Sequence, residues 1–127
     1  MTEQLQPIPE IDRLVHEPAR LAILTVLAAC ERADFLFLER ATGLTRGNLS
    51  VQLTRLEEAG LIEIEKIIER KRTLTMATLV RRGRHVLDRY WQDMDEIRAR
   101  AKNKTTKAAK DVRPAQGFPG KVVPARG

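Results

Sequence analysis

The stretch from Thr42 to Leu61 constrains the fold more than any other part of the chain. It reads T-G-L-T-R-G-N-L-S-V-Q-L-T-R-L-E-E-A-G-L. Gly43 can adopt the left-handed backbone that a tight turn between two helices needs, and Thr45 carries the hydroxyl of a good helix N-cap. Gly60 stands where a helix is terminated in the left-handed conformation. The sequence therefore predicts a tight turn followed by a helix over residues 46–59.

The predicted helix is amphipathic. Leu49, Leu53 and Leu56 recur at i, i+4 and i+7, so they fall on one face. The rest of its surface, up to the first acid at Glu57, consists of small, hydroxyl, amide and guanidinium side chains. Among them are Arg46, Gly47, Asn48, Ser50, Val51, Thr54 and Arg55. Together with Thr45 at the cap, they are the residues of this segment that we expect to bind DNA. Such groups bond base edges or phosphates, which suits a helix lying in a DNA major groove. The alternative is an ordinary solvated helix.

The residues that follow this helix predict a β-hairpin with a basic tip. From Ile62 to Ile67 apolar and polar residues alternate with period two, as they do in a half-buried strand. The charged run Glu69-Arg70-Lys71-Arg72 interrupts the pattern, and the alternation resumes from Thr73 to Leu79. The tip is therefore expected at residues 68–73. Helix, turn, helix and then hairpin is the winged helix-turn-helix order.

Two strings carry a resemblance to a known family. They are G-L-T-R-G-N-L-S-V-Q-L-T-R-L-E-E-A-G-L-I-E-I-E-K and, upstream, H-E-P-A-R-L-A-I-L. The chain resembles the winged-helix transcriptional regulators of the MarR/ArsR-like group, most closely the small single-domain members built around T-x-G-N-L-S-x-x-L-x-x-L-E-x-A-G. The match covers roughly residues 10–100. The resemblance implies a dimeric DNA-binding regulator in which the helix from Arg46 is the recognition helix and the hairpin is the wing.

The start of the next helix departs from this group. Such proteins often begin it with T-P-E-G-R, whereas this chain has Val80-Arg81-Arg82-Gly83-Arg84. The hydroxyl of the N-cap, the helix-starting proline and the acid that favours the helix dipole are all lost. The local charge is also reversed, and three added arginines could reach phosphate.

Upstream of the turn, the sequence predicts an irregular arm and three helices. Residues 1–9 hold two prolines and form the arm, and apolar residues at 11, 14 and 15 indicate a short leading helix. Pro18 is well placed to start a second helix that runs to about residue 31. Asp34 is the expected N-cap of a third helix over residues 35–42. Its Leu36 and Phe37 exceed what the helix pair needs; we expect them to fill a larger core, and the alternative is a dimer or ligand surface.

After the hairpin, a long helix is expected over residues 81–102. Apolar residues recur along it with a period close to 3.5 and form a coiled-coil-like seam. Its predicted dimerisation residues are Leu87, Tyr90, Trp91, Met94 and Ile97. We expect this helix to form a homodimer, because it is long for a small core and a palindromic site requires a two-fold partner. The alternative is that it packs on its own domain.

Residues 103–127 lose all periodicity and hold three of the six prolines, which predicts a basic disordered tail. Charge is distributed unevenly along the chain. Residues 46–86 hold nine Lys or Arg against five acids, and residues 103–127 hold six against one, whereas residues 1–45 have four Arg and seven acids. Positive charge thus concentrates where a polyanion would be met. The tail could add phosphate attraction, or it could only maintain solubility.

Other kinds of chemistry find no support in the sequence. Cys30, His16 and His85 are too few and too scattered for a metal centre, so we expect neither metal nor cofactor. The sequence contains no nucleophile elbow, phosphate-binding glycine loop or paired carboxylates, and we predict no enzymatic activity. It contains no apolar run of about 18 residues, and its first ten residues lack the charged start and apolar stretch of a signal peptide, so we expect neither a membrane span nor a signal peptide. A single cysteine fits a reducing cytoplasm, where we expect the protein to act.

The fold expected from these patterns is mainly α with a small β-hairpin: a winged helix-turn-helix domain over residues 10–80 with a long C-terminal helix. The expected function is that of a homodimeric, sequence-specific regulator of transcription that binds double-stranded DNA, acting as a repressor. Helix 46–59 would lie in the major groove, and the basic residues Arg70, Lys71 and Arg72 would lie on the backbone or in a minor groove. Two alternatives stay open: a protein-interaction module, and a sensor that responds to a small-molecule effector.

Overall fold

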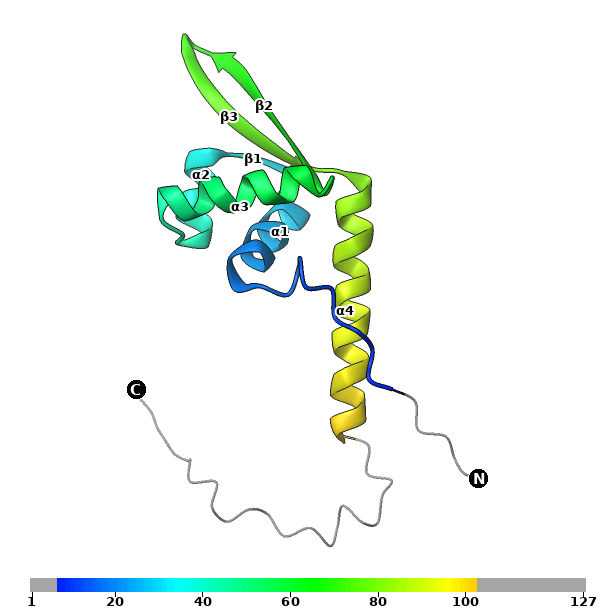
Figure 1. Ribbon diagram of the computed structural model, residues 1–127. Helices are drawn as coiled ribbons and strands as arrows, with labels where there is room; N and C mark the ends of the chain where they lie inside the picture. Colours follow the sequence, from blue (N-terminus) through cyan, green and yellow to red (C-terminus); the bar gives the residue numbers. More distant parts are fainter. Residues whose placement is uncertain (1–6, 103–127) are drawn as a thin grey trace, which may run out of the picture.

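A computed structural model describes residues 7–102 and shows four helices with a three-stranded antiparallel sheet (Figure 1). The elements are α1 (Pro18–Cys30), β1 (Arg32–Asp34), α2 (Phe35–Thr42), α3 (Arg46–Glu58), β2 (Ile62–Glu69), β3 (Arg72–Leu79) and α4 (Arg81–Lys102). The expected winged helix-turn-helix fold with a long C-terminal helix is confirmed. The predicted tail at residues 103–127 and the first six residues of the predicted arm lie outside the described residues.

Helices α1, α2 and α3 pack around an aliphatic core. Each contributes at least one fully buried leucine: Leu24 from α1, Leu38 from α2 and Leu49 from α3. Burial of each such side chain contributes about 1.5–3 kcal/mol, so this shared interior is what holds three short helices together. The residues of the α3 face that the leucine spacing predicted to be apolar are all buried, which turns the opposite face of α3 toward solvent.

The caps of these helices were predictable from local chemistry. The carboxylate of Asp34 accepts a hydrogen bond from the backbone N–H of Phe37 at 2.8 Å, and the hydroxyl of Thr45 accepts one from Asn48 N–H at 3.1 Å. Gly43, between α2 and α3, is left-handed with φ +75°. Helix α1 begins at Pro18 as expected, although its cap is the side chain of Glu17.

The short leading helix predicted from residues 11, 14 and 15 does not form. Instead, one carboxylate oxygen of Asp12 accepts hydrogen bonds from the backbone N–H groups of Leu14 at 2.9 Å and Val15 at 3.3 Å. This side-chain turn competes with helix formation for the same backbone donors. Val15 is fully buried all the same, so its apolar signal reflected core packing and not helical periodicity.

The sheet has the order β1-β3-β2, and its first strand was not predicted. Strand β1 spans only three residues and pairs antiparallel with β3, with Ala33 opposite Ala77. Strands β2 and β3 form the predicted hairpin, in register from Ile62 opposite Leu79 to Glu69 opposite Arg72. The hairpin projects beyond the helices as a wing (Figure 1). Strand β1 anchors its base to the segment that leads into α2.

Helix α4 leaves the base of the hairpin and extends past the helical body, with the segment from Pro7 running beside it (Figure 1). Its first turn packs closely on the chain: a methyl group on Gly83 would overlap the carbonyl oxygen of Leu61. Further along, the hydroxyl of Tyr90 and Nδ1 of His16 lie 2.8 Å apart and are hydrogen-bonded. The helix therefore starts at Arg81 as predicted, fixed by close packing instead of a polar cap.

Candidate nucleic-acid interface

The solvent-facing side of α3 carries the side chains that the sequence assigned to DNA contact. All eight of these residues, Thr45, Arg46, Gly47, Asn48, Ser50, Val51, Thr54 and Arg55, are exposed. Val51 is 50% exposed although it is apolar, and it stands among polar neighbours. An exposed valine on such a face can contact the methyl group of a thymine.

The N-terminal end of α3 is electropositive. The first turn has no acidic side chain, and its free N–H groups add the positive end of the helix dipole. The guanidinium of Arg46 lies beside it, with Nη2 at 3.7 Å from Oε1 of Glu39. Oε1 of Glu39 is buried and makes no hydrogen bond within residues 7–102. Its charged partner is the guanidinium of Arg46. Glu39 thus holds Arg46 beside the start of α3 while leaving most of its side chain exposed.

Gly47 has no structural reason to be glycine. Its helix is regular, and no atom lies within 4 Å of the position that a Cβ would occupy. Glycine inside a helix costs about 0.5–1 kcal/mol relative to alanine, so the fold alone would be more stable with a side chain here. A bare backbone at this point is useful only to a molecule that approaches α3 from outside.

The tip of the hairpin is a two-residue turn made of Arg70 and Lys71. Both have positive φ, 51° and 63°, the left-handed conformation that tight hairpin turns require and that glycine or asparagine usually supplies. Both residues are exposed, as is Arg72, which follows them. Two long cations therefore occupy positions that local backbone energetics disfavours, at the exposed tip of the hairpin.

The structure brings the wing and the start of α3 together across a groove. The groove has a volume of about 520 Å³ and is lined by Asp34, Phe35, Leu36, Arg46, Gly47, Ser50, Arg72, Thr73, Leu74 and Thr75. Arg46 and Arg72, far apart in the sequence, stand on this one groove. The rest of the lining consists of hydroxyl groups, the bare helix backbone at Gly47, three apolar side chains and the carboxylate of Asp34. A phosphodiester strand can be held there by two guanidinium groups and by hydroxyl donors.

The remaining predicted contacts lie outside that groove. Arg70 and Lys71 are at the hairpin tip, and Arg55 is in the last turn of α3. Of the three arginines at the start of α4, Arg84 donates a hydrogen bond to the carbonyl oxygen of Ala28 at 3.2 Å. Arg84 therefore caps the end of α1 in this structure.

One residue that was not predicted, Gln52, also belongs to this face. Gln52, on α3, is half-buried and bonds both Asn48 and the buried Arg20 of α1. The spacing of four between Asn48 and Gln52 was a visible signal, since side chains four apart on a helix meet. The contact with Arg20 could not be read from the sequence, because it joins residues 32 positions apart.

The five residues assigned to dimerisation do not share one surface. Leu87 and Tyr90 are 3% and 2% exposed and lie in the core of the chain itself. This half of α4 packs on its own domain, because the tight contact at Gly83 brings it against the body. Trp91 is exposed, with its ring 5.0 Å from that of Tyr90, and Met94 and Ile97 are half-buried.

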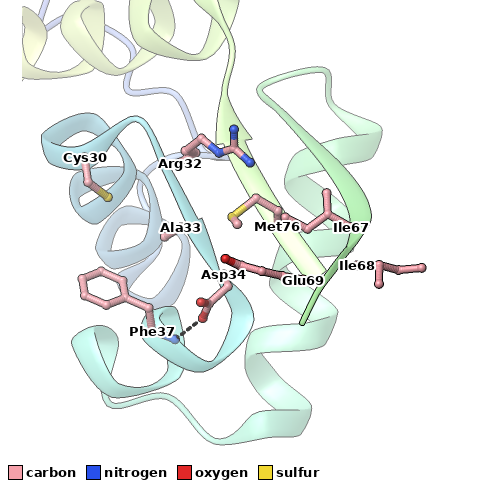
Figure 2. Close-up of a pocket in the computed structure, with 9 residues that line it drawn as sticks. All are labelled: Cys30, Arg32, Ala33, Asp34, Phe37, Ile67, Ile68, Glu69 and Met76. Atoms are coloured by element: carbon pink, nitrogen blue, oxygen red, sulfur yellow. Dashed lines mark hydrogen bonds between the residues drawn. The ribbon is translucent and has the colours of Figure 1, made fainter. Parts of the chain in front are cut away.

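The expectation that Leu36 and Phe37 fill a larger core is wrong. They are 41% and 50% exposed, because α2 has only eight residues and Leu38 alone of its side chains is buried. Phe37 instead lines an open cavity of about 600 Å³ beside β1 (Figure 2). The side chains around it come from the end of α1, from β1, from the start of α2 and from the hairpin. They are Cys30, Arg32, Ala33, Asp34, Phe37, Ile67, Ile68, Glu69 and Met76.

Within residues 7–102, no three His, Cys, Asp or Glu side chains gather where they could hold a metal ion. Over the same range, no helix is both long enough and apolar enough to cross a membrane.

Comparison with known proteins agrees with this geometry. The sequence is 31% identical to an uncharacterized protein of Methanocaldococcus jannaschii over 78 residues, which are 61% of this chain and 85% of that protein. The fold is similar to that of a transcriptional regulator homologue from Pyrococcus horikoshii, with a TM-score of 0.68, 24% identity, and coverage of 72% of this chain and 90% of that one. It is also similar to a MarR-family regulator from Silicibacter pomeroyi, with a TM-score of 0.55, 23% identity, and coverage of 77% and 65%.

The family model described as a winged helix DNA-binding domain matches residues 19–98, which include nearly all of α1, every element from β1 to β3 and most of α4. This range contains both α3 and the wing, the two elements that form the groove lined by Arg46 and Arg72. The chain therefore belongs to the family of winged-helix DNA-binding domains.

Proposed function

We propose that this DNA-binding protein is a homodimeric repressor of transcription that recognises a specific double-stranded DNA site. The observation that carries the proposal is the groove between α3 and the wing, with Arg46 on one side and Arg72 on the other. A phosphate strand held in this groove would fix the protein on the duplex without reading its sequence. The exposed face of α3 would then lie along the major groove.

Sequence would be read by the middle of α3. Ser50, Val51 and Thr54 follow the bare backbone of Gly47 on the same exposed side. The hydroxyl of Thr54 donates to the carbonyl oxygen of Ser50 at 3.1 Å, so it presents its oxygen outward as an acceptor. Val51 supplies an apolar contact for a thymine methyl group. Arg55 and the wing-tip cations Arg70 and Lys71 would neutralise phosphates on either side.

The homodimer is proposed from the second half of α4. Trp91, Met94 and Ile97 keep apolar surface on a helix that continues past its own domain (Figure 1). A second copy joined there by a two-fold axis would present two α3 helices to the same side of a duplex. Half-sites about one helical turn apart, roughly 34–36 Å, would suit such an arrangement.

The open cavity beside Phe37 favours one second candidate function, that of a ligand-responsive regulator. Its volume of about 600 Å³ lies in the range of small-molecule sites, and apolar side chains make up much of its wall. A ligand there would contact both α2 and the hairpin, and so would bias the position of the wing. A thermal-shift screen of small organic acids and aromatic metabolites tests this candidate, and a screen without hits would remove its support.

The main proposal is tested by selecting bound fragments from random double-stranded DNA and then measuring affinity for the selected site. Val51→Asp should abolish preference for that site, because a carboxylate on this face would be repelled by the duplex. Thr25→Asp is the matched control, since it adds the same charge at an exposed position on α1. Normal binding by Val51→Asp would refute the assignment of α3 to the major groove.

A further inference from the structure

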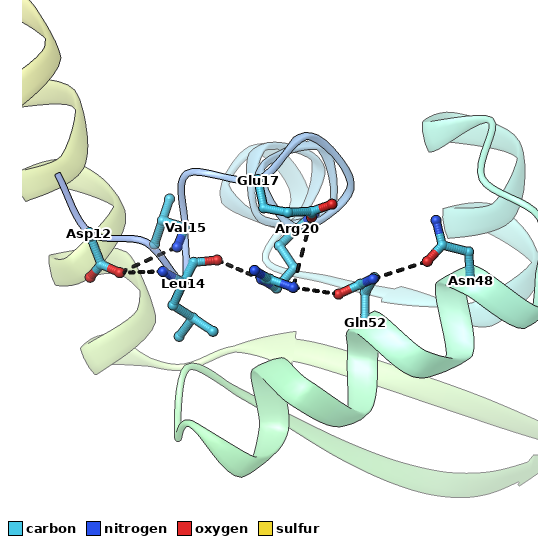
Figure 3. A network of polar contacts seen from close by, with 7 residues as sticks. All are labelled: Asp12, Leu14, Val15, Glu17, Arg20, Asn48 and Gln52. Atoms are coloured by element: carbon cyan, nitrogen blue, oxygen red, sulfur yellow. Dashed lines mark hydrogen bonds and ion pairs between the residues drawn. The ribbon is translucent and has the colours of Figure 1, made fainter.

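A chain of hydrogen bonds runs from the N-terminal segment through the protein to the recognition face of α3 (Figure 3). It starts at the carbonyl oxygen of Leu14, which accepts from Nε of Arg20 at 2.6 Å. Nη1 of Arg20 then donates to Oε1 of Gln52 at 2.7 Å, and Nε2 of Gln52 donates to Oδ1 of Asn48 at 3.0 Å. The chain ends at Asn48, which is exposed.

Arg20 sets the direction of every bond in this chain. It is 9% exposed, and Glu17 lies beside it with Oε1 at 3.9 Å from Nη1. A guanidinium has only donors and does not lose its proton in proteins, so the group that meets it has to be an acceptor. Gln52 must therefore turn its oxygen to Arg20, which leaves its NH₂ group toward Asn48.

The same logic passes one step further. The NH₂ of Gln52 is a donor, so Asn48 must turn its Oδ1 toward it. The Nδ2 group of Asn48 is then directed away from Gln52, toward the solvent side of α3 (Figure 3). A free asparagine can rotate its amide to offer either an oxygen or a nitrogen. Here the buried cation removes that freedom, and Asn48 offers a hydrogen-bond donor.

We propose that Asn48 is a specificity-determining residue that selects a keto base, guanine or thymine, and that Gln52 is the positioning residue that sets this choice. This inference rests on the proposed function, because it requires α3 to lie in the major groove. Asn48 Nδ2 would make this choice at the exocyclic group of the base, where guanine O6 and thymine O4 accept a hydrogen bond and adenine N6 and cytosine N4 carry donors. Purine N7 also accepts, but guanine and adenine share it, so it does not distinguish them. The usual bidentate pairing of asparagine with adenine needs an outward oxygen as well, and that oxygen is held by Gln52.

The size of the preference follows from one hydrogen bond. A net contribution of about 1 kcal/mol for a single bond corresponds to roughly a five-fold preference at the contacted position. Asn48→Ala should remove that preference and leave the rest of the selected site unchanged.

The decisive variant is Gln52→Glu. A carboxylate at this position still accepts from Arg20, now as an ion pair, so the variant is expected to fold. It has no donor, and it must instead accept from Nδ2 of Asn48, which turns Oδ1 outward. The base preference at this one position should therefore invert from guanine or thymine to adenine or cytosine. Apart from this inversion, affinity should fall by a common factor for all sites, because a negative charge has been added near the duplex. Gln92→Glu, on the exposed surface of α4, controls for that charge.

The experiment selects bound fragments from random DNA with the wild-type chain, Asn48→Ala, Gln52→Glu and Gln92→Glu, after thermal melting has shown that each is folded. If Gln52→Glu does not fold, Gln52→Met replaces it: the released amide should then accept adenine as well as the keto bases. If the wild type enriches no sequence, the proposed function fails. If it enriches a site whose composition stays the same in Asn48→Ala and Gln52→Glu, the proposed function stands and this inference is overturned.

Discussion

A substitution at Gly47 should separate the effects on folding from those on DNA binding. A side chain at this position should stabilise the fold but weaken binding to DNA. In Gly47→Ala, the added methyl group meets no atom of the chain within 4 Å, and the helix gains a residue that favours it. The free energy of unfolding should rise by about 0.5–1 kcal/mol. For a domain of this size, the melting temperature should then increase by about 2–8 °C.

Affinity for the selected DNA site should move the other way. If the duplex approaches the backbone at Gly47, a methyl group there overpacks the contact at about 1–3 kcal/mol, which is a loss of roughly 5- to 150-fold. Thermal unfolding and fluorescence anisotropy with labelled DNA measure the two effects. Thr25→Ala, an exposed position on α1, controls for a general change in helix propensity. A stabilised Gly47→Ala that binds DNA as tightly as the wild type would refute the close approach of DNA at α3.

Three further predictions concern packing, the wing and the dimer. Gly83→Ala should lower the free energy of unfolding by about 1–3 kcal/mol, because the methyl group would overlap the carbonyl oxygen of Leu61. Chemical denaturation measures this change. An unchanged denaturation midpoint would contradict the close packing at the start of α4. Replacing Arg70 and Arg72 together by alanine should weaken binding to all DNA sequences. It should also reduce the steepness of the plot of log binding constant against log salt concentration by about two. An unchanged slope would exclude phosphate contacts by the wing. Met94→Asp should convert the proposed dimer to a monomer in light scattering, whereas Gln92→Asp should not; a Met94→Asp dimer would move the interface elsewhere.

The helix-turn-helix unit was predictable because its signals act over a few residues. Asp34 and Thr45 cap the helices that follow them, and Gly43 takes the left-handed conformation that only a glycine adopts without strain. The hairpin and the two cations at its tip follow from alternation interrupted by charge. The exposed face of α3 follows from the spacing of its buried leucines. Each of these features is a property of one local segment, which is why sequence reasoning located them within a residue or two.

The features that were missed or misjudged depend on segments that meet only in the folded chain. Three residues at β1 carry no pattern of their own, and they become a strand because β3 offers free backbone groups beside them. Phe37 is exposed because no other element covers that side of α2. Tyr90 is buried because Gly83 lets α4 approach the body.

On the exposed face of α3, some features were determined by the sequence alone and others by the tertiary structure. The amino-acid order determined which side chains α3 turns to solvent, because a helix of fixed period has only one way to bury three leucines. Tertiary structure decided which end of the Asn48 amide faces outward, because the deciding charge, Arg20, lies on another helix and reaches α3 only through the packed core. Arg20 fixes the orientation of the Gln52 amide, and Gln52 in turn fixes that of Asn48, because these side chains are in direct contact. The contact between Arg20 and Gln52 exists only in the folded chain.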